Sequence, residues 1–386
     1  MKLALCLEYP IDQHGGTEVL VRELIHGLSP RHQILLVSAD DPAALAGSSV
    51  AAHVTEHLRW LPEACSRENS RRLAAQLAAA RPDLVHFHLG ESYAWKSLRP
   101  WKSPLTATAR TGLPVITTNH GAFSIFSGCC PEDSPRIKKL ALLPPAWLGK
   151  QGTLARLRTE VAVSQNDFHA LRRWYPLLAA KFRWIYHSRL HGSPPPFNPH
   201  RRPTILCAGT IGLRKGQPLL VEAFGRIARQ FPDWRLVFIG RAGEDAMMRQ
   251  MQEIIARHHI EKQIQFLGSR SDAELREWLE QSAVFAMPSV YEGLGLSLQE
   301  AQFCGCACVA TRCGGTADLI TDGENGLLVP VGDAPALAGA LEKLLGDAAL
   351  RERFSRRAPQ SVLEKNMTAD KMVAAYEQLY AEMVNR

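Results

Sequence analysis

The sequence predicts an α/β protein of two domains, each built on a parallel sheet. Its 386 residues exceed what one hydrophobic core usually holds, so two domains are expected. Short apolar runs alternate with segments of helical periodicity, as strands alternate with helices in α/β proteins. Between Val284 and Val329, a strand, a glycine loop and a helix follow one another twice. In parallel α/β sheets ligands bind at such loops, outside the carboxyl ends of the strands.

The first half of the chain opens with a buried strand and an amphipathic helix. A loop between them ends in Gly15-Gly16. The next expected elements are a strand over 33–38, a helix over 59–80, a strand over 82–88, a strand from Leu113 into His120-Gly121, and a strand over 161–164. The pattern loosens over 123–159, which is a loop or a helix.

The second half begins after a proline-rich segment, 192–199, which we interpret as the domain linker. The strand over 204–208 leads into the loop Gly209–Gly216. The later expected elements are a helix over 219–229, strands over 235–240 and 264–268, a helix over 272–282, and helices over 334–345 and 369–384.

Two carboxylates flank the glycine loop after the strand at 284–287. Glu292 and Glu300 are separated by seven residues, and the glycines between them let backbone amides approach a ligand closely. Ser297 is expected to cap the following helix. A helix start suits phosphate, and carboxylates accept from hydroxyl groups. The pattern therefore indicates a ligand with both groups, such as a nucleotide sugar.

The net charge of +7 is unevenly distributed. Residues 1–200 hold 23 Lys and Arg against 15 Asp and Glu, a net of +8, whereas the remainder is close to neutral. A basic amino-terminal half indicates an anionic partner such as a phospholipid surface or a lipid-phosphate acceptor, although a solvated basic face explains most of these residues equally well. Nucleic-acid binding would rest on charge alone and is not expected.

No stretch has the length of uninterrupted apolar sequence that a membrane helix needs. The apolar run at the start of the chain is cut by Glu8 and Pro10, so we interpret it as a strand and not as an export signal. Cysteines without a disulfide framework also favour a reducing compartment. We therefore predict a cytoplasmic protein, with peripheral contact at the inner face of the membrane as a further option.

The nine cysteines show no disulfide framework. Cys304, Cys306, Cys308 and Cys313 invite a zinc site, but they lack the paired C-x-x-C spacing of structural zinc sites. Small apolar side chains packed in a strand and its flanking turns explain them better.

The segment PSVYEGLGLSLQEAQFCGCACVATRCGGTADLITDGENGLLV resembles the donor site of retaining glycosyltransferases of the GT-B fold, family 4 in particular. The resemblance implies two Rossmann-like domains facing across a cleft. It implies an acceptor-side domain over 1–190, a nucleotide-sugar donor domain over 191–368, and a carboxyl-terminal helix over 369–386 that packs back toward the first domain.

In the donor domain the resemblance assigns the following roles. Glu300 accepts from ribose hydroxyls, Glu292 contacts a sugar hydroxyl and favours the positive charge that develops on the ring, and Lys215 stabilises the departing diphosphate. The position of the family's second cation holds Thr210, and Arg214 is the candidate replacement. Phosphate and sugar are held by the amides of Gly293, Leu294, Gly295 and Leu296.

In the first domain the resemblance covers Gly15-Gly16 and His120. Gly16 is implied near the donor phosphates, and His120 is implied to reach the transferred sugar, because neutral imidazole offers one N–H. His86 matches a family position but is interpreted as structural. His187 stands where the family usually has asparagine.

The basic segment 123–159 is the candidate for acceptor or membrane contact. Lys138, Lys139 and Lys150 would lie near anionic headgroups, with Trp147 and leucines entering the apolar layer. A long acceptor loop without a membrane role is the alternative.

The activity implied is transfer of a hexose-type sugar from a UDP- or GDP-linked donor to a glycan, lipid-linked or small-molecule acceptor, with retention. No Asp-x-Asp pair occurs, so no metal or other cofactor is expected. A sugar-nucleotide hydrolase or epimerase on the same fold is one alternative. The other is a catalytically silent nucleotide-sugar-binding subunit, which the departures at Thr210, His187 and Asp318 keep open.

Overall fold

The computed structural model divides the chain into two compact units. Unit 1 comprises Met1–Arg189 and Ala369–Arg386, and unit 2 comprises Leu190–Thr368. The boundary expected from the sequence, after residue 190, lies one residue later than this division, and the helix expected over 369–386 is part of unit 1. The structure describes residues 1–12, 15–61, 66–89, 98–121, 136–243 and 245–385.

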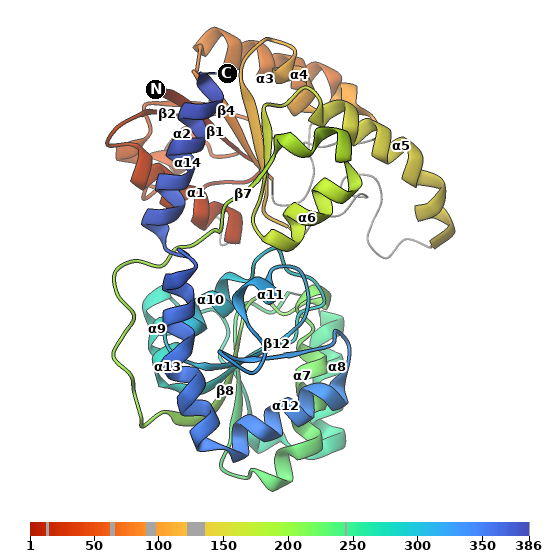
Figure 1. The fold of residues 1–386 in the computed structure, drawn as a ribbon, viewed down its shortest axis with the longest axis vertical. Helices are drawn as coiled ribbons and strands as arrows, with labels where there is room; N and C mark the ends of the chain where they lie inside the picture. The colour runs from red at the N-terminus through yellow and green to blue at the C-terminus, as the bar shows by residue number, and fades with distance from the viewer. Residues whose placement is uncertain (13–14, 62–65, 90–97, 122–135, 244, 386) are drawn as a thin grey trace. The chain divides into compact units, whose positions relative to one another are not determined.

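Unit 1 contains a parallel sheet with the strand order β3-β2-β1-β4-β5-β6-β7 (Figure 1). The strands are β1 (Lys2–Leu7), β2 (Gln33–Ser38), β3 (Glu56–Arg59), β4 (Leu84–Leu89), β5 (Val115–Asn119), β6 (Thr159–Ala162) and β7 (Phe182–Trp184). The order in which successive strands are added to the sheet reverses between β1 and β4, as in Rossmann folds, and ligands bind at the carboxyl ends of the strands at such a point.

The helices of unit 1 are α1 (Gly16–Leu28), α2 (Pro42–Ala46), α3 (Arg67–Ala80), α4 (Pro104–Ala109), α5 (Arg136–Leu154), α6 (Gln165–Trp174) and α14 (Ala369–Val384). The single helix expected over 59–80 is wrong at its start. Residues 56–59 pair with β2 as strand β3, and α3 begins only after Ser66, whose side chain accepts from the amide of Asn69.

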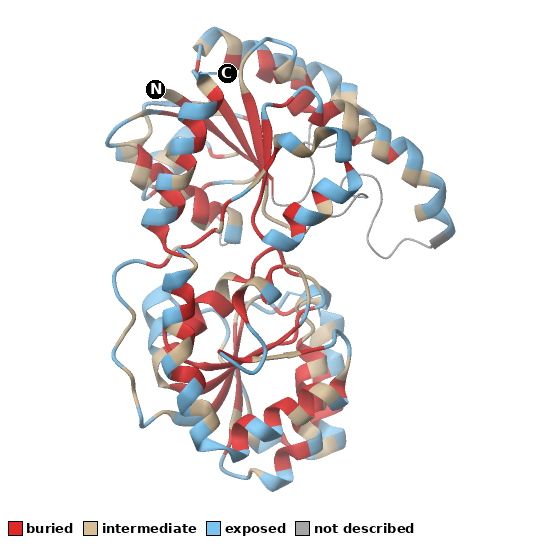
Figure 2. Ribbon diagram, viewed as in Figure 1, coloured by how far each residue is buried: buried red, intermediate tan, exposed pale blue. Residues whose placement is uncertain are grey.

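The two faces of this sheet differ in polarity. Alternate side chains of β4 point to opposite faces, and Val85 and Phe87 belong to an apolar core with Leu73 and Leu77 of α3. On the other face, α14 lies against β4 and beside α1. There the buried side chains of β4 include His86 and His88 (Figure 2 shows the buried strands in red).

Unit 2 contains a six-stranded parallel sheet with the order β10-β9-β8-β11-β12-β13. Its strands are β8 (Arg202–Ala208), β9 (Arg235–Ile239), β10 (Ile264–Phe266), β11 (Ser282–Met287), β12 (Ala307–Thr311) and β13 (Leu327–Val329). Its helices are α7 (Gln217–Ile227), α8 (Asp245–His258), α9 (Asp272–Gln281), α10 (Leu296–Phe303), α11 (Thr316–Leu319), α12 (Ala334–Gly346) and α13 (Ala348–Glu364).

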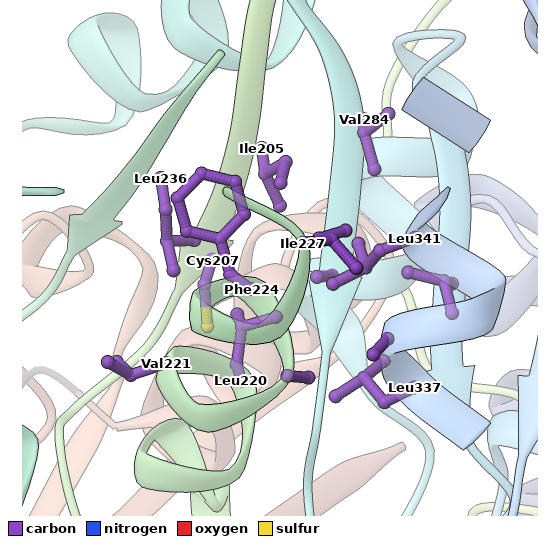
Figure 3. Packing of buried hydrophobic residues seen from close by; sticks show 14 of the residues in the cluster. Ile205, Cys207, Leu220, Val221, Phe224, Ile227, Leu236, Val284, Leu337 and Leu341 are labelled. Carbon is purple, nitrogen blue, oxygen red and sulfur yellow. The ribbon is translucent and has the colours of Figure 1, made fainter. Parts of the chain in front are cut away.

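Apolar side chains of the sheet and of α7 and α12 form the core of unit 2 (Figure 3). Ile205 of β8, Phe224 of α7 and Leu341 of α12 are fully buried in it. This core fixes α7 against the sheet, so the loop that joins β8 to α7 has a rigid support at both ends.

The elements that the sequence did not predict include α2, α4, α8, α13, β7 and β13. Pro359 lies inside helix α13. Proline in a helix interior removes a backbone hydrogen bond, so the local sequence argues against a helix here. Tertiary packing overrides that signal, because Phe354, Ala358 and Val362 on one face of α13 are buried. Within the described part of the chain, no helix combines the length and the apolar character that crossing a bilayer requires.

Candidate functional site

The loop after β8 approaches the loop after β11. Gly216 has φ +63°, and a Cβ atom there would lie 2.2 Å from the carbonyl oxygen of Pro288. Only glycine permits both that conformation and that approach. The buried side chain of Gln217 closes the loop, because its Nε2 donates to the carbonyl of Thr210 at 3.1 Å and its Oε1 accepts from the amide of Gly212 at 3.3 Å.

Lys215 and Glu292 form an ion pair at the carboxyl ends of β8 and β11. Lys215 Nζ lies 2.6 Å from Glu292 Oε1, and the Lys215 side chain is 22% exposed against 9% for Glu292. Ser289 Oγ also donates to Glu292 Oε1, at 2.7 Å. Since β8 and β11 are neighbours at the reversal of strand order in this sheet, the pair lies at the point where parallel α/β sheets bind ligands.

A second glycine turn supports the Glu292 loop from the side of β12. Gly314 has φ +47°, and a Cβ atom there would lie 1.7 Å from the carbonyl oxygen of Glu292. The amide of Gly315 donates to the carbonyl of Gly293 at 3.0 Å. The Gly-Gly turn therefore fixes the backbone that carries Glu292.

Helix α10 begins at this loop. Gly295 is its N-cap with φ +97°, and no side chain caps the helix. Ser297, expected as the cap, lies inside the first turn, because the left-handed conformation of Gly295 starts the helix earlier. The segment Gly293 to Leu296 therefore leads directly into the amino end of α10, where backbone amides suit an anion. Glu300 lies in the same helix and is buried.

Thr210 and Arg214 occupy different parts of the loop after β8, and both are exposed. The carbonyl of Arg214 accepts from the amide of Val290 at 2.9 Å, so its backbone helps to join the two loops. Ser289 and Gln217 were missed by the sequence analysis. A polar residue in the turn that follows a buried strand is a signal that could have identified Ser289, two residues after the end of β11.

The cysteines of unit 2 have packing roles. Cys306 Sγ donates to the carbonyl of Leu279 at 3.0 Å, and burial raises the pKa of Cys306 to about 11 and that of Cys304 to about 12. A buried neutral thiol of this kind is a poor metal ligand. Among the described residues, no group of three His, Cys, Asp or Glu side chains is placed to hold a metal ion. The expectation that the reaction needs no metal stays a prediction.

Unit 1 holds the two remaining predicted residues. Gly16 is the first residue of α1, which follows the loop after β1. His120 follows β5 directly, and its amide donates to the carbonyl of Leu89 at 2.9 Å. Both lie at carboxyl ends of strands in the same sheet. The structure thus brings Lys215 and Glu292 into contact within unit 2, whereas Gly16 and His120 belong to unit 1.

His120 is part of a cluster of imidazoles. Its Nε2 lies 3.1 Å from Nδ1 of His88, and its ring centroid lies 4.8 Å from that of His187. Burial, followed by the neighbouring imidazoles, holds the pKa of His88 and His120 well below the usual value, and burial lowers that of His187 to about 3. These imidazoles are therefore neutral at physiological pH.

A buried chain of hydrogen bonds connects this cluster to α14. Tyr380 OH lies 2.7 Å from Nδ1 of His86, and Nε2 of His86 lies 2.8 Å from Oγ1 of Thr118. Tyr376 OH lies 2.9 Å from Thr118 Oγ1 and 2.7 Å from Nε2 of His187. The structural interpretation of His86 agrees with these contacts. The sequence did not predict a polar role for Tyr376 and Tyr380, because aromatic residues at helical spacing more often pack in the hydrophobic core.

Segment 123–159 is described from residue 136 onward; Cys129-Cys130 of this segment lie outside the described residues. Lys150 is fully buried, with Nζ 3.9 Å from Oε1 of Glu160, so its expected place near headgroups is wrong. Trp147 donates to the carbonyl of Trp174 at 2.8 Å and packs against the core, so it is not available to an apolar layer either.

Comparison with known proteins gives the family. Residues 14–188 match Glycosyltransferase Family 4, and residues 193–361 match Glycosyl transferases group 1. The chain is 33% identical over 379 residues to the phosphatidyl-myo-inositol mannosyltransferase of Mycolicibacterium smegmatis, covering 94% of this chain and 89% of the relative. It is 28% identical over 325 residues to the D-inositol 3-phosphate glycosyltransferase of Jonesia denitrificans, covering 78% and 73%.

Among solved structures, Anabaena Alr3699/HepE in complex with UDP has a similar fold. The TM-score is 0.76 at 17% identity, over 99% of this chain and 100% of that one. The two parallel sheets with alternating helices, one in each unit, are those of the GT-B fold. Fold, family matches and relatives agree, and the chain belongs to glycosyltransferase family 4.

Proposed function

We propose that this glycosyltransferase moves a hexose from a nucleotide-diphosphate sugar to a lipid-linked or glycan acceptor, with retention and without a metal ion. The observation that carries the proposal is the contact of Lys215 with Glu292 beside the amino end of α10. A cation, a carboxylate and backbone amides at one switch point match a ligand that has a diphosphate and hydroxyl groups.

The chemistry follows from these groups. The bond between the anomeric carbon and the diphosphate oxygen breaks, and Lys215 stabilises the charge that develops on the departing diphosphate. Glu292 stabilises the positive charge on the sugar ring, and Glu300 accepts from the ribose hydroxyls. The acceptor oxygen bonds to the same face of the anomeric carbon, and its proton passes to the departing phosphate. In unit 1, His120 donates to a hydroxyl of the transferred sugar.

Exposed apolar residues on α5 favour a lipid-linked acceptor. Ile137 is 82% exposed, Leu140 69% and Leu148 61%. Lys138 is exposed beside them. Apolar side chains with an adjacent cation suit the boundary of an anionic bilayer. We therefore place the enzyme at the cytoplasmic face of the membrane, where the buried free thiols of Cys6 and Cys207 stay reduced.

The donor is tested by thermal unfolding with UDP, GDP, ADP and their common sugar conjugates. A ligand that binds only the folded state, present at 100 times its dissociation constant, stabilises it by about 2.7 kcal/mol. One nucleotide class should raise the melting temperature strongly, and release of nucleotide should then require an acceptor. Absence of any shift contradicts the proposal. Nucleotide release without acceptor would indicate a hydrolase, and binding without turnover would indicate a silent subunit.

Membrane contact is tested by sedimentation with vesicles of phosphatidylcholine alone or mixed with an anionic phospholipid. Binding should require the anionic lipid and should fall in Leu140→Glu. The control is Leu363→Glu, because Leu363 lies on α13 of unit 2 and is also exposed. Equal binding of both variants contradicts a role for α5.

A further inference from the structure

His88 and His120 contact each other through one ring nitrogen each, and the second ring nitrogen of each residue takes no part in this contact. Nδ1 of His88 lies 3.1 Å from Nε2 of His120, and the ring centroids are 5.3 Å apart. Among the residues that the structure describes, Nε2 of His88 and Nδ1 of His120 are buried atoms without a hydrogen-bond partner. Buried polar atoms are rarely left unpaired in folded proteins, so these two nitrogens need an explanation.

Proton counting leaves two arrangements. Each neutral imidazole carries one N–H. If His88 donates from Nδ1, then Nε2 of His120 accepts, and the proton of His120 is on Nδ1. If His120 donates from Nε2, its Nδ1 is a bare acceptor, and the proton of His88 is on Nε2. Each arrangement therefore leaves one unpaired N–H, on His120 in the first case and on His88 in the second.

The positions of the two residues favour the first arrangement. His88 lies inside β4 and is fully buried, whereas His120 follows the end of β5 and is partly exposed as a residue. A buried N–H without an acceptor raises the free energy of the folded state, and the cost remains unless a bound ligand supplies the acceptor. Both nitrogens are buried atoms, but Nδ1 of His120 belongs to a residue beyond the last position of β5, on the side where parallel sheets bind ligands, whereas Nε2 of His88 belongs to a residue inside β4.

We propose that His88 is a positioning residue that fixes the tautomer of His120, so that Nδ1–H of His120 is directed as a hydrogen-bond donor to a hydroxyl oxygen of the bound sugar. This inference rests on the proposed function for the identity of the ligand. It goes beyond that function in assigning to His88 the role of fixing which nitrogen of His120 donates. His86, the other histidine of β4, bonds to Thr118 and Tyr380 in the chain toward α14.

The tautomer is measured without any ligand. The protein is labelled with ¹⁵N in the histidine rings, and the signals of His88 and His120 are assigned from the spectra of single variants. At pH 7.5, wild-type His120 should show a protonated Nδ1 and an unprotonated Nε2. His88→Asn keeps an amide N–H close to the position of Nδ1 and should preserve this state. His88→Leu removes the donor, and His120 should change to the Nε2–H form.

Binding supplies the second readout. Relative to wild type, His88→Leu should lose about threefold to tenfold in affinity for the nucleotide sugar, as expected for one hydrogen bond. Its affinity for the nucleoside diphosphate alone should stay unchanged, and His88→Asn should restore most of the loss. The control is His169→Asn, because His169 is exposed on α6 of the same unit.

The outcomes separate the inference from the proposed function. A wild-type His120 with its proton on Nε2, or a protonated Nδ1 that persists in His88→Leu, overturns the inference. An equal loss of affinity for nucleotide sugar and nucleoside diphosphate also overturns it, since that would indicate a general structural defect. If no nucleotide binds the wild type, the proposed function fails, and the ring spectra still decide which histidine donates.

Discussion

The phenolic oxygen of Tyr376 lies 2.7 Å from Nε2 of His187, joining two positions 189 residues apart in the sequence. The same oxygen lies 2.9 Å from Oγ1 of Thr118, and Tyr376 is fully buried. The carboxyl-terminal helix is thus held to the sheet of unit 1 by directed hydrogen bonds in addition to apolar contact. This relationship leads to the first two predictions.

Tyr376→Phe should destabilise unit 1. The substitution keeps the ring but removes the hydroxyl, so two buried polar groups lose a partner, at a cost of about 1–3 kcal/mol. Thermal and urea unfolding measure the loss. Glu377→Gln is the control on the same helix, because Glu377 contacts Arg31 at 2.7 Å and His32 at 2.9 Å near the surface, and each such surface pair contributes at most about 1 kcal/mol. If the free energy of unfolding falls no more than in Glu377→Gln, the Tyr376 hydroxyl contributes little to stability.

Acid should weaken the folded state through the neutral imidazoles. Burial lowers the pKa of His187 from 6.5 to about 3. Between these values the unfolded chain binds more protons, so the stabilisation is complete above pH 6.5 and is lost as the pH falls toward 3. At pH 5 this residue alone accounts for a loss on the order of 2 kcal/mol. His86, His88 and His120 shift in the same direction.

Urea unfolding at pH 7.5 and pH 5 measures this dependence. His187→Asn removes one titrating group, so its stability should fall less between the two pH values than that of the wild type. The pH-independent part of the mutational effect is read at pH 7.5. The same fall in both proteins would mean that His187 does not titrate in this way.

Lys215→Ala should lower turnover more than donor affinity. Removing a group that stabilises charge in the transition state costs about 10²–10³ in kcat. The apo contact with Glu292 means that some donor affinity also changes, so the measurement compares kcat with the dissociation constant of the donor. Lys262→Ala is the control, because Lys262 is exposed in the same unit. A drop in affinity with unchanged kcat would refute the proposed role in the transition state.

Glu300→Ala should weaken nucleotide binding. A hydrogen bond to a charged group contributes about 1.5–3 kcal/mol, which corresponds to about 10- to 150-fold in affinity. Titration with the nucleotide found in the thermal panel measures it. Glu253→Ala, at an exposed position of α8, should bind normally. Unchanged affinity in Glu300→Ala would remove this residue from the ribose role.

Gly216→Ala should destabilise unit 2 and disturb the donor loops, because its Cβ would lie 2.2 Å from the carbonyl of Pro288 in a left-handed conformation. Gly339→Ala is a matched control. It lies inside α12 with no atom within 4 Å of its Cβ position, so it should stabilise by about 0.5–1 kcal/mol through the preference of helices for alanine. Melting temperatures that move in the same direction would contradict this account.

The sequence alone determined the fold class and part of the candidate site. Glycine loops after apolar runs mark the carboxyl ends of parallel strands, because only glycine permits the turn and the close approach. The carboxylates at 292 and 300 could be selected because they flank such a loop, and the cation at 215 through the resemblance to the family. Local periodicity also gave most strands correctly, since each signal lies within a few residues.

The tertiary structure decided what depends on distant partners. The start of α3 depends on the pairing of 56–59 with β2, and α13 forms around Pro359 because burial of one face outweighs the local penalty. The contact of Lys215 with Glu292 spans 77 residues, and that of His86 with Tyr380 spans 294. Such contacts depend on which strands are neighbours and on where helices pack. Because local sequence periodicity does not encode either of these, the contacts could not be predicted from it.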